Sequence, residues 1–181
     1  MKQNRENPFF ETYRTPFGTP PFDQIETEQY EPAFDEGIWQ LDEEVRAIAD
    51  NTELPTFENT IIALERSGKL LDKVISAFFN VLNAEADDEM MDISQRVSPK
   101  LSESSNNIYL NEQLFARVKS VYDRKDELHL PMEDARLLEK TFEAFCARGA
   151  ALGPEEKEKY RKLSSELSLL SLTFDQNALK D

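Results

Sequence analysis

The residue types that most often bind metals or act as nucleophiles are nearly absent from this chain. His129 is the single histidine and Cys146 is the single cysteine. A protein zinc site needs several histidine or cysteine ligands at a fixed spacing, such as the two histidines of H-E-x-x-H on one helical face. The sequence therefore predicts no metal-binding residue and no cofactor-binding residue.

Neither His129 nor Cys146 is predicted to be catalytic. His129 lies just before Pro131 with no carboxylate motif beside it, so we interpret it as an ordinary loop or packing residue. Cys146 shares a helical neighbourhood with Phe142 and Phe145, which predicts a buried and unreactive thiol. A cysteine-histidine pair in space stays open, but nothing in the spacing supports it.

Paired carboxylates are abundant, and their abundance weakens them as a signal. Glu139 and Glu143 lie four residues apart, but with 36 acidic residues chance alone produces such pairs. A solvated helix face is the better interpretation. The 5 glycines form no phosphate-binding loop pattern, and no EF-hand loop surrounds Asp87 and Asp88. The residues alone thus predict no catalytic group.

The composition is that of a folded and strongly acidic protein. Its 181 residues suffice for one domain with a sizeable core, and 39% hydrophobic residues with only 5 glycines favour a folded helical chain. The net charge of -15 predicts that neither nucleic acid nor an anionic membrane surface is a partner. A single cysteine, with no apolar leader and no span-length apolar run, predicts a cytoplasmic protein.

Apolar periodicity predicts an all-α, multi-helix bundle of about six or seven helices around one long central helix. An extended arm at residues 1–25 precedes it, where prolines alternate with aromatic residues that we interpret as packing anchors. The helical domain is predicted to span residues 26–181, with Trp39 as a further packing anchor. Helices are expected at about residues 27–50 with an interruption or restart at Pro32, 57–86, 87–108 with a kink at Pro99, 114–122, 131–148 and 154–181.

The central helix is predicted to begin within residues 54–68. Pro55 stops any preceding helix, Thr56 is well placed as an N-cap, and Glu58 puts a carboxylate at the positive end of the helix dipole. Apolar residues then recur at steps of three and four at Phe57, Ile61, Leu64, Leu71, Ile75, Phe78 and Leu82, except that Gly68 occupies the position between Leu64 and Leu71. Gly68 indicates either a close crossing by another helix or a helix end. The unbroken period favours the crossing, so one helix to about Ala86 is expected.

The last predicted helix carries an apolar stripe that continues towards the end of the sequence. Its members recur at steps of three and four at Tyr160, Leu163, Leu167, Leu170 and Phe174. No cap or turn residue follows before Asp181. This pattern is typical of a helix that has been cut, so the domain is expected to be truncated at its C-terminal end.

Several stretches are similar, in order and spacing, to the N-terminal region of the thimet oligopeptidase family of zinc metallopeptidases. The signature stretch is PTFENTI at residues 55–61, followed by LERSG at residues 64–68. The others are TPFGTPPFD at 15–23 with YEPAF at 30–34, SPKL at 98–101 with IYLN at 108–111 and LFARV at 114–118, and RLLE at 136–139 with GAAL at 149–152 and ELS at 166–168. The resemblance covers nearly the whole chain, and the early stretches are similar to the bacterial peptidyl-dipeptidase branch.

The resemblance implies an activity for a longer parent protein. In this family a deep channel divides a helical molecule, and the zinc site, H-E-x-x-H plus a later Glu, lies in the C-terminal half. The N-terminal helices form much of the opposite wall and restrict entry to short, unfolded peptides. The parent is thus expected to be a monomeric, zinc-dependent peptidyl-dipeptidase that releases C-terminal dipeptides. This fragment lacks the zinc site, so it is expected to be inactive alone and to have the missing catalytic half as its partner.

Two alternatives stay open. One is an oligopeptidase A-like endopeptidase of the same family, which differs in subsites outside this chain. The other is a stand-alone acidic helical module that binds a peptide or a protein. A cut domain should expose a large apolar patch, whereas an independent module should have a capped last helix and a soluble surface. Self-association of the isolated chain would be only weak support for the cut domain, because many modules dimerise.

Overall fold

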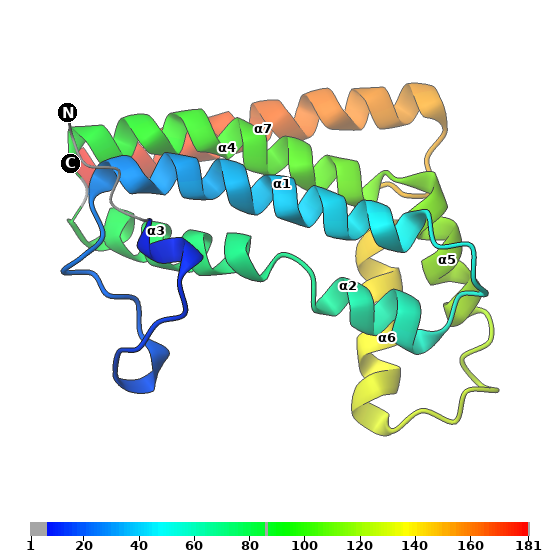
Figure 1. Ribbon diagram of the computed structural model, residues 1–181. Coiled ribbons are helices and arrows are strands. Elements are labelled where there is room, and N and C mark those ends of the chain that lie inside the picture. The colour runs from blue at the N-terminus through cyan, green and yellow to red at the C-terminus, as the bar shows by residue number, and fades with distance from the viewer. Residues whose placement is uncertain (1–6, 86, 181) are drawn as a thin grey trace.

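A computed structural model describes residues 7–85 and 87–180 and shows an all-α bundle (Figure 1). Its α-helices are α1 (Tyr30–Ala49), α2 (Ala63–Glu65), α3 (Lys69–Glu85), α4 (Asp88–Tyr109), α5 (Glu112–Tyr122), α6 (Met132–Ala147) and α7 (Pro154–Lys180). Short 3-10 turns at Pro8–Phe10, Pro16–Gly18 and Thr27–Gln29 precede α1, and a π-helical turn at Phe57–Ile62 precedes α2. The described residues contain no strand, which confirms the predicted fold class.

Helices α1, α3, α4 and α7 run roughly along one long axis, and α5 and α6 lie at one end of them (Figure 1). Helix α1 packs on α3 and α4, and α7 packs along α4. Helix α4 begins where it is predicted to, because the Asp87 side chain caps it by accepting a hydrogen bond from the Met90 N–H at 2.8 Å. It continues through Pro99 as a single helix.

The prediction of one long central helix is wrong, because the helix ends at Gly68 and a new helix begins after it. The expected N-cap is present: Thr56 Oγ1 accepts from the Asn59 N–H at 3.1 Å. Gly68 then adopts a φ of 75°, in the left-handed region that favours glycine, and this conformation ends one helix before α3 begins. A side chain at Gly68 would also approach Leu41 of α1, with its Cβ 3.2 Å from Leu41 Cδ1. Both readings of this glycine therefore hold, but the helix end decides the fold.

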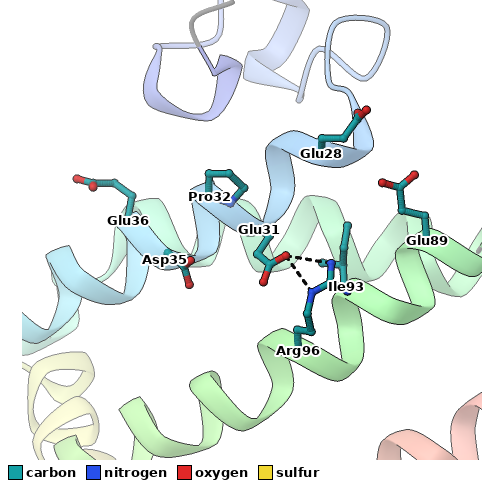
Figure 2. A pocket seen from close by; sticks show the side chains of 8 residues that line it. All are labelled: Glu28, Glu31, Pro32, Asp35, Glu36, Glu89, Ile93 and Arg96. Atoms are coloured by element: carbon teal, nitrogen blue, oxygen red, sulfur yellow. Dashed lines mark hydrogen bonds and ion pairs between the residues drawn. The ribbon is translucent and has the colours of Figure 1, made fainter. Parts of the chain in front are cut away.

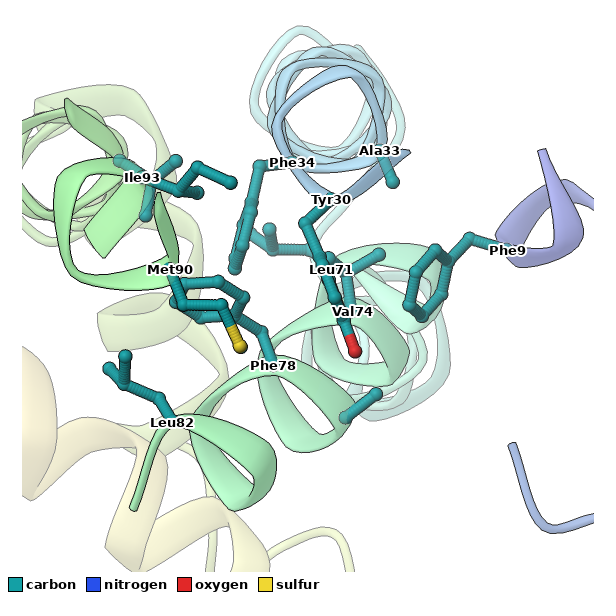
Figure 3. Close-up of a cluster of buried hydrophobic side chains, with 12 residues drawn as sticks. Phe9, Tyr30, Ala33, Phe34, Leu71, Val74, Phe78, Leu82, Met90 and Ile93 are labelled. Atoms are coloured by element: carbon teal, nitrogen blue, oxygen red, sulfur yellow. The ribbon is translucent and has the colours of Figure 1, made fainter. Parts of the chain in front are cut away.

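The break at Gly68 divides the apolar side chains between two cores. The N-terminal core is built from Phe9, Tyr30, Ala33, Phe34, Leu71, Val74, Ala77, Phe78, Leu82, Met90, Ile93 and Val97 (Figure 3). The C-terminal core is built from Val45, Ile48, Ala49, Ile61, Leu114, Val118, Val121, Leu138, Phe145 and Ala150. Leu41 packs against both cores. The apolar period runs unbroken through Gly68 because the segments on either side each bury one face, but in different cores.

A lysine of α3 fastens the arm to the bundle. Lys73 Nζ donates hydrogen bonds to the carbonyl oxygens of Phe9 and Glu11, at 2.8 and 2.7 Å, and lies 3.7 Å from the ring centroid of Tyr13. Phe9 is buried in the N-terminal core, so the packing role predicted for the arm aromatics is confirmed there. It is wrong for Phe17, whose side chain is fully exposed.

Candidate functional site

The structure places the single histidine and the single cysteine, the two side chains best suited to catalysis, far apart. His129 lies exposed in the loop between α5 and α6 with a φ of 47°, and Cys146 lies in the last turn of α6. At 1.5 Å per residue, the length of α6 puts them about 20 Å apart. They cannot form a catalytic pair across that distance.

The prediction that Cys146 is buried is wrong, because its thiol is exposed. Phe145, its neighbour in sequence, is fully buried in the C-terminal core. One residue further along a helix turns the side chain by about 100°, which carries Cys146 out of that core. Sequence proximity to aromatic residues was therefore a poor guide to burial.

Glu139 and Glu143 have structural partners on the solvated face of α6. Glu139 lies 3.5 Å from both Lys125 and Arg136, and Glu143 lies 2.6 Å from Lys140. The hydrogen bond from Lys140 lowers the pKa of Glu143, so this carboxyl is held ionised and is poorly suited to act as an acid. Their interpretation as a solvated helix face is confirmed.

The residues present do not fit a zinc site. Among the side chains that the structure describes, no group of three or more His, Cys, Asp or Glu is placed to hold a metal ion. No catalytic step through zinc can therefore be derived from this chain. The expectation that it carries no catalytic, cofactor-binding or metal-binding residue stays a prediction.

A groove of about 710 Å³ lies between the start of α1 and the first turns of α4 (Figure 2). It is lined by Glu28, Glu31, Pro32, Asp35, Glu36, Glu89, Ile93 and Arg96. Five carboxyl groups against one guanidinium make it an environment that repels anions. We call it the acidic groove.

Ion pairs between α1 and α4 organise the acidic groove. Arg96 donates from Nε to Glu31 Oε2 at 3.0 Å, and Lys100 Nζ lies 2.5 Å from Asp35 Oδ1. The hydrogen bond from Arg96 lowers the pKa of Glu31, although partial desolvation opposes the shift. The carboxylates of Glu31 and Asp35 are thus already paired within the fold. The main role of these ion pairs is to hold α1 against α4.

A second hollow of about 700 Å³ lies between the arm and α3. Its wall includes Tyr13, whose hydroxyl oxygen is buried without a hydrogen-bond partner. Burial and the neighbouring Tyr30 raise the pKa of Tyr13 to about 12, so the phenol stays neutral. Burial lowers the pKa of Lys73, which nevertheless donates to two carbonyls there. These contacts hold the arm and supply no nucleophile-base pair.

Helix α7 packs on its neighbours through polar side chains. Asn106 of α4 donates from Nδ2 to Ser164 Oγ at 2.8 Å, and Arg161 donates to Asn107 Oδ1 at 2.9 Å. The buried Lys157 lies 3.1 Å from Glu112. These contacts fix one face of α7 against α4 and the start of α5.

The apolar stripe predicted on α7 lies on another face, which is open to solvent. Leu163, Leu167, Leu170 and Phe174 are between 64% and 73% exposed. Spacings of four, three and four residues put them in one row along the helix. We call these four residues the α7 seam. An exposed apolar row of this kind is typical of an interaction surface.

The prediction for Trp39 is also wrong. Its side chain is 59% exposed on α1 instead of anchoring the core. Its neighbour Ile38 packs against the N-terminal core, and the turn between them carries Trp39 outwards.

No helix within the described residues is both long and apolar enough to span a membrane.

Sequence reasoning overlooked Arg117, which is buried at the junction of α5 and residues 51–60. Its guanidinium donates to the carbonyl oxygens of Asn51 and Glu53 at 2.5 and 3.0 Å, and to Asn59 Oδ1 at 3.0 Å. A signal was present, because Arg117 follows Leu114 by three residues on the face of the helix that Val118 and Val121 share. Its role is structural, since its guanidinium donates to backbone and side-chain oxygens of the segment that it holds in place.

Comparisons with known proteins relate this chain to peptidases several times its length. It is 43% identical to the dipeptidyl carboxypeptidase of Escherichia coli (strain K12) over 173 residues, which are 96% of this chain and 25% of that protein. The dipeptidyl carboxypeptidase of Salmonella typhimurium is 39% identical over the same shares. Oligopeptidase A of Escherichia coli is 23% identical over 91% of this chain and 24% of its own length. No family model matches, and the chain spans about a quarter of the length of these relatives.

Proposed function

We propose that this sequence corresponds to the N-terminal region of a member of the thimet oligopeptidase family and forms the channel-wall domain of a zinc-dependent peptidyl-dipeptidase. The observation that carries the proposal is 43% identity over 96% of the chain to a dipeptidyl carboxypeptidase of which it spans 25%. The whole protein would release C-terminal dipeptides from short peptides. Zinc would polarise the scissile carbonyl and activate water, with all of its ligands outside this chain.

In this proposal the described residues supply shape and charge. Two separately packed cores make a rigid helical body, and the acidic groove gives one side of it a negative field. Such a body can narrow access to a catalytic centre held by the rest of the protein. A cytoplasmic, monomeric parent belongs to the same proposal, supported by the single cysteine and the reducing compartment that it suits.

The alternatives have weaker support. An oligopeptidase A-like endopeptidase would predict closer similarity to that branch, whereas the identity is 23% against 43% for the dipeptidyl carboxypeptidase. A stand-alone binding module has the acidic groove in its favour. The α7 seam counts against it, because a module that works alone has no reason to leave four large apolar side chains in water.

The first test is to sequence the gene beyond the codon for Asp181. The proposal expects an open frame that reaches H-E-x-x-H and a later Glu. The purified product should release dipeptides from N-blocked tetrapeptides, lose activity with a chelator and regain it with zinc.

A stop codon close to Asp181 would contradict the proposal and favour the stand-alone module. Cleavage inside longer peptides without dipeptide release would favour the endopeptidase. The 181-residue chain alone is expected to be inactive, and stoichiometric zinc with peptide cleavage in a clean preparation of it would also overturn the proposal.

A further inference from the structure

A hollow of about 430 Å³ lies between α4 and α7, and hydroxyl groups from both helices line it. Helix α4 contributes Ser98, Ser102 and Ser105, and α7 contributes Ser164 and Ser168. We call this hollow the serine groove. Its volume is in the range of sites that take small organic molecules. The charge and the chemistry of its lining therefore decide which molecule would fit.

The serine groove has one charged residue in its lining, and that residue is the cation Arg148. Each of four other hollows in the described part of the chain is lined by at least two carboxyl groups. No carboxyl group of a described residue lines the serine groove, although the chain has 36 acidic residues. An anion is therefore repelled less at this hollow than at the other four.

The guanidinium of Arg148 is held in place but is not neutralised. Its Cζ lies 4.1 Å from the centroid of the Tyr109 ring, and its Nη1 lies 3.4 Å from Ser105 Oγ, which is a long hydrogen bond. Among the described residues it has no ion pair. A cation just after α6 complements the dipole of that helix, which accounts for the charge but leaves the forked N–H groups unused. Those groups match the two oxygens of a carboxylate.

Apolar side chains in the same lining favour an anion with an apolar body. Phe79 and Leu101 pack against the N-terminal core and Tyr109 packs against the C-terminal core, and each of the three keeps part of its surface accessible. A bare phosphate ion would use none of these carbon atoms. A free amino group on the ligand would find no carboxyl partner among the described residues that line the groove.

We propose that the serine groove binds a small carboxylate that has an aromatic or aliphatic body and no free amino group. Arg148 binds the carboxylate, and the serine hydroxyls donate to it or to an amide of the body. Phe79, Leu101 and Tyr109 contact the body. Nothing in this inference requires the zinc-binding part of a longer protein, so it goes beyond the proposed function and can fail without affecting it.

Nuclear magnetic resonance titration of the 181-residue chain tests this inference. The probe is N-acetylphenylalanine at pH 7, and the matched control ligand is its amide, which has the same body without the charge. A ligand of about fifteen non-hydrogen atoms should bind with a dissociation constant of about 1 mM. The amide should bind at least tenfold more weakly. The largest backbone shifts should be those of Ser105, Tyr109 and Arg148.

Variants of the chain identify the groups that bind the probe. Arg148→Gln should weaken binding of the carboxylate at least tenfold. Arg46→Gln is the matched control, because it removes the same charge beside a different hollow, and the affinity should change less than twofold. Ser102→Leu narrows the serine groove without changing its charge, so it should weaken the carboxylate at least fivefold even if Arg148→Gln fails to fold.

Several results would overturn the inference. Equal affinity for N-acetylphenylalanine and its amide would show that the guanidinium does not bind the carboxylate. Shifts centred on another hollow, or no saturation up to about 20 mM, would show that the groove is not a site for this ligand. Inorganic phosphate that binds as tightly as N-acetylphenylalanine would show that the groove takes any small oxyanion, and that the apolar lining selects nothing.

Discussion

The two cores of this bundle are stabilised by different physics. In the N-terminal core, aromatic rings meet edge to face, as Phe34 and Phe78 do at 5.3 Å and 85°. Against the C-terminal core, the rings of Tyr122 and Phe142 stack at 3.9 Å, and the buried Arg117 of α5 donates to neutral oxygens of residues 51–60. The first core depends on shape and the second on satisfying a buried charge. Similar burial therefore implies different sensitivities to mutation.

The largest effect is expected in the N-terminal core. Phe78→Ala removes a fully buried ring between α1 and α3 and should lower the free energy of unfolding by about 3–5 kcal/mol through lost burial and a cavity. Chemical denaturation measures the loss. Phe10→Ala is the control, because Phe10 is exposed on the arm and its truncation should cost less than about 0.5 kcal/mol. Equal losses would show that aromatic packing does not hold this core.

In the C-terminal core, the expected effect comes from unsatisfied polar groups. Arg117→Met keeps much of the side-chain volume but leaves the carbonyls of Asn51 and Glu53 without their donor, at about 2–4 kcal/mol. Arg124→Met is the matched control, because Arg124 lies just beyond the end of α5 and its half-buried guanidinium donates to Pro55 O. If both variants cost the same, charge satisfaction is not what distinguishes the two cores.

The same contrast separates what could be predicted from the sequence from what could not. Helix starts depend on local chemistry, so the cap at Thr56 and the start of a helix at Asp87 were correctly predicted. Periodicity tells which residues share a face but not what covers that face. For this reason the helix break at Gly68 was missed. The apolar residues keep the same spacing on both sides of Gly68, but those before it are buried in the C-terminal core and those after it in the N-terminal core.

Long-range contacts limited the prediction of the candidate site. Cys146 and Trp39 each lie one residue from a core position, and a 100° turn decided their exposure. The seam on α7 was predicted as a stripe, but its exposure depends on α4 offering polar partners to the opposite side. The spacing of Arg117 puts it on the buried face of its helix, but a charged residue is ordinarily expected to be exposed.

A smaller effect is expected where the arm joins the N-terminal core. Lys73→Met removes two hydrogen bonds to arm carbonyls and the contact with the Tyr13 ring, at about 1–2 kcal/mol. Limited proteolysis should then cut the arm faster while the rest of the chain stays protected. Lys69→Met, one turn earlier beside the same hollow, should leave the cleavage rate unchanged. Equal cleavage of both variants would mean that packing alone holds the arm.

The smallest effect should come from the rim of the N-terminal core, where Glu31 pairs with Arg96. Arg96 lowers the pKa of this carboxyl, so the pair stabilises the fold above the ordinary value of 4.5, and the contribution disappears as the pH falls through the lowered pKa. Solvent screening limits it to about 1 kcal/mol at most. Glu31→Gln should therefore unfold more easily than the natural chain at pH 7 but not at pH 3, and 1 M salt should narrow the gap. Glu36→Gln is the control in the same groove, because Glu36 accepts a hydrogen bond from Gln40 and not from a guanidinium, and it should leave the free energy of unfolding at pH 7 nearly unchanged. A gap that persists at pH 3 would mean that the side chain matters through packing, and the rim would then follow the shape-dependent physics of the core beneath it.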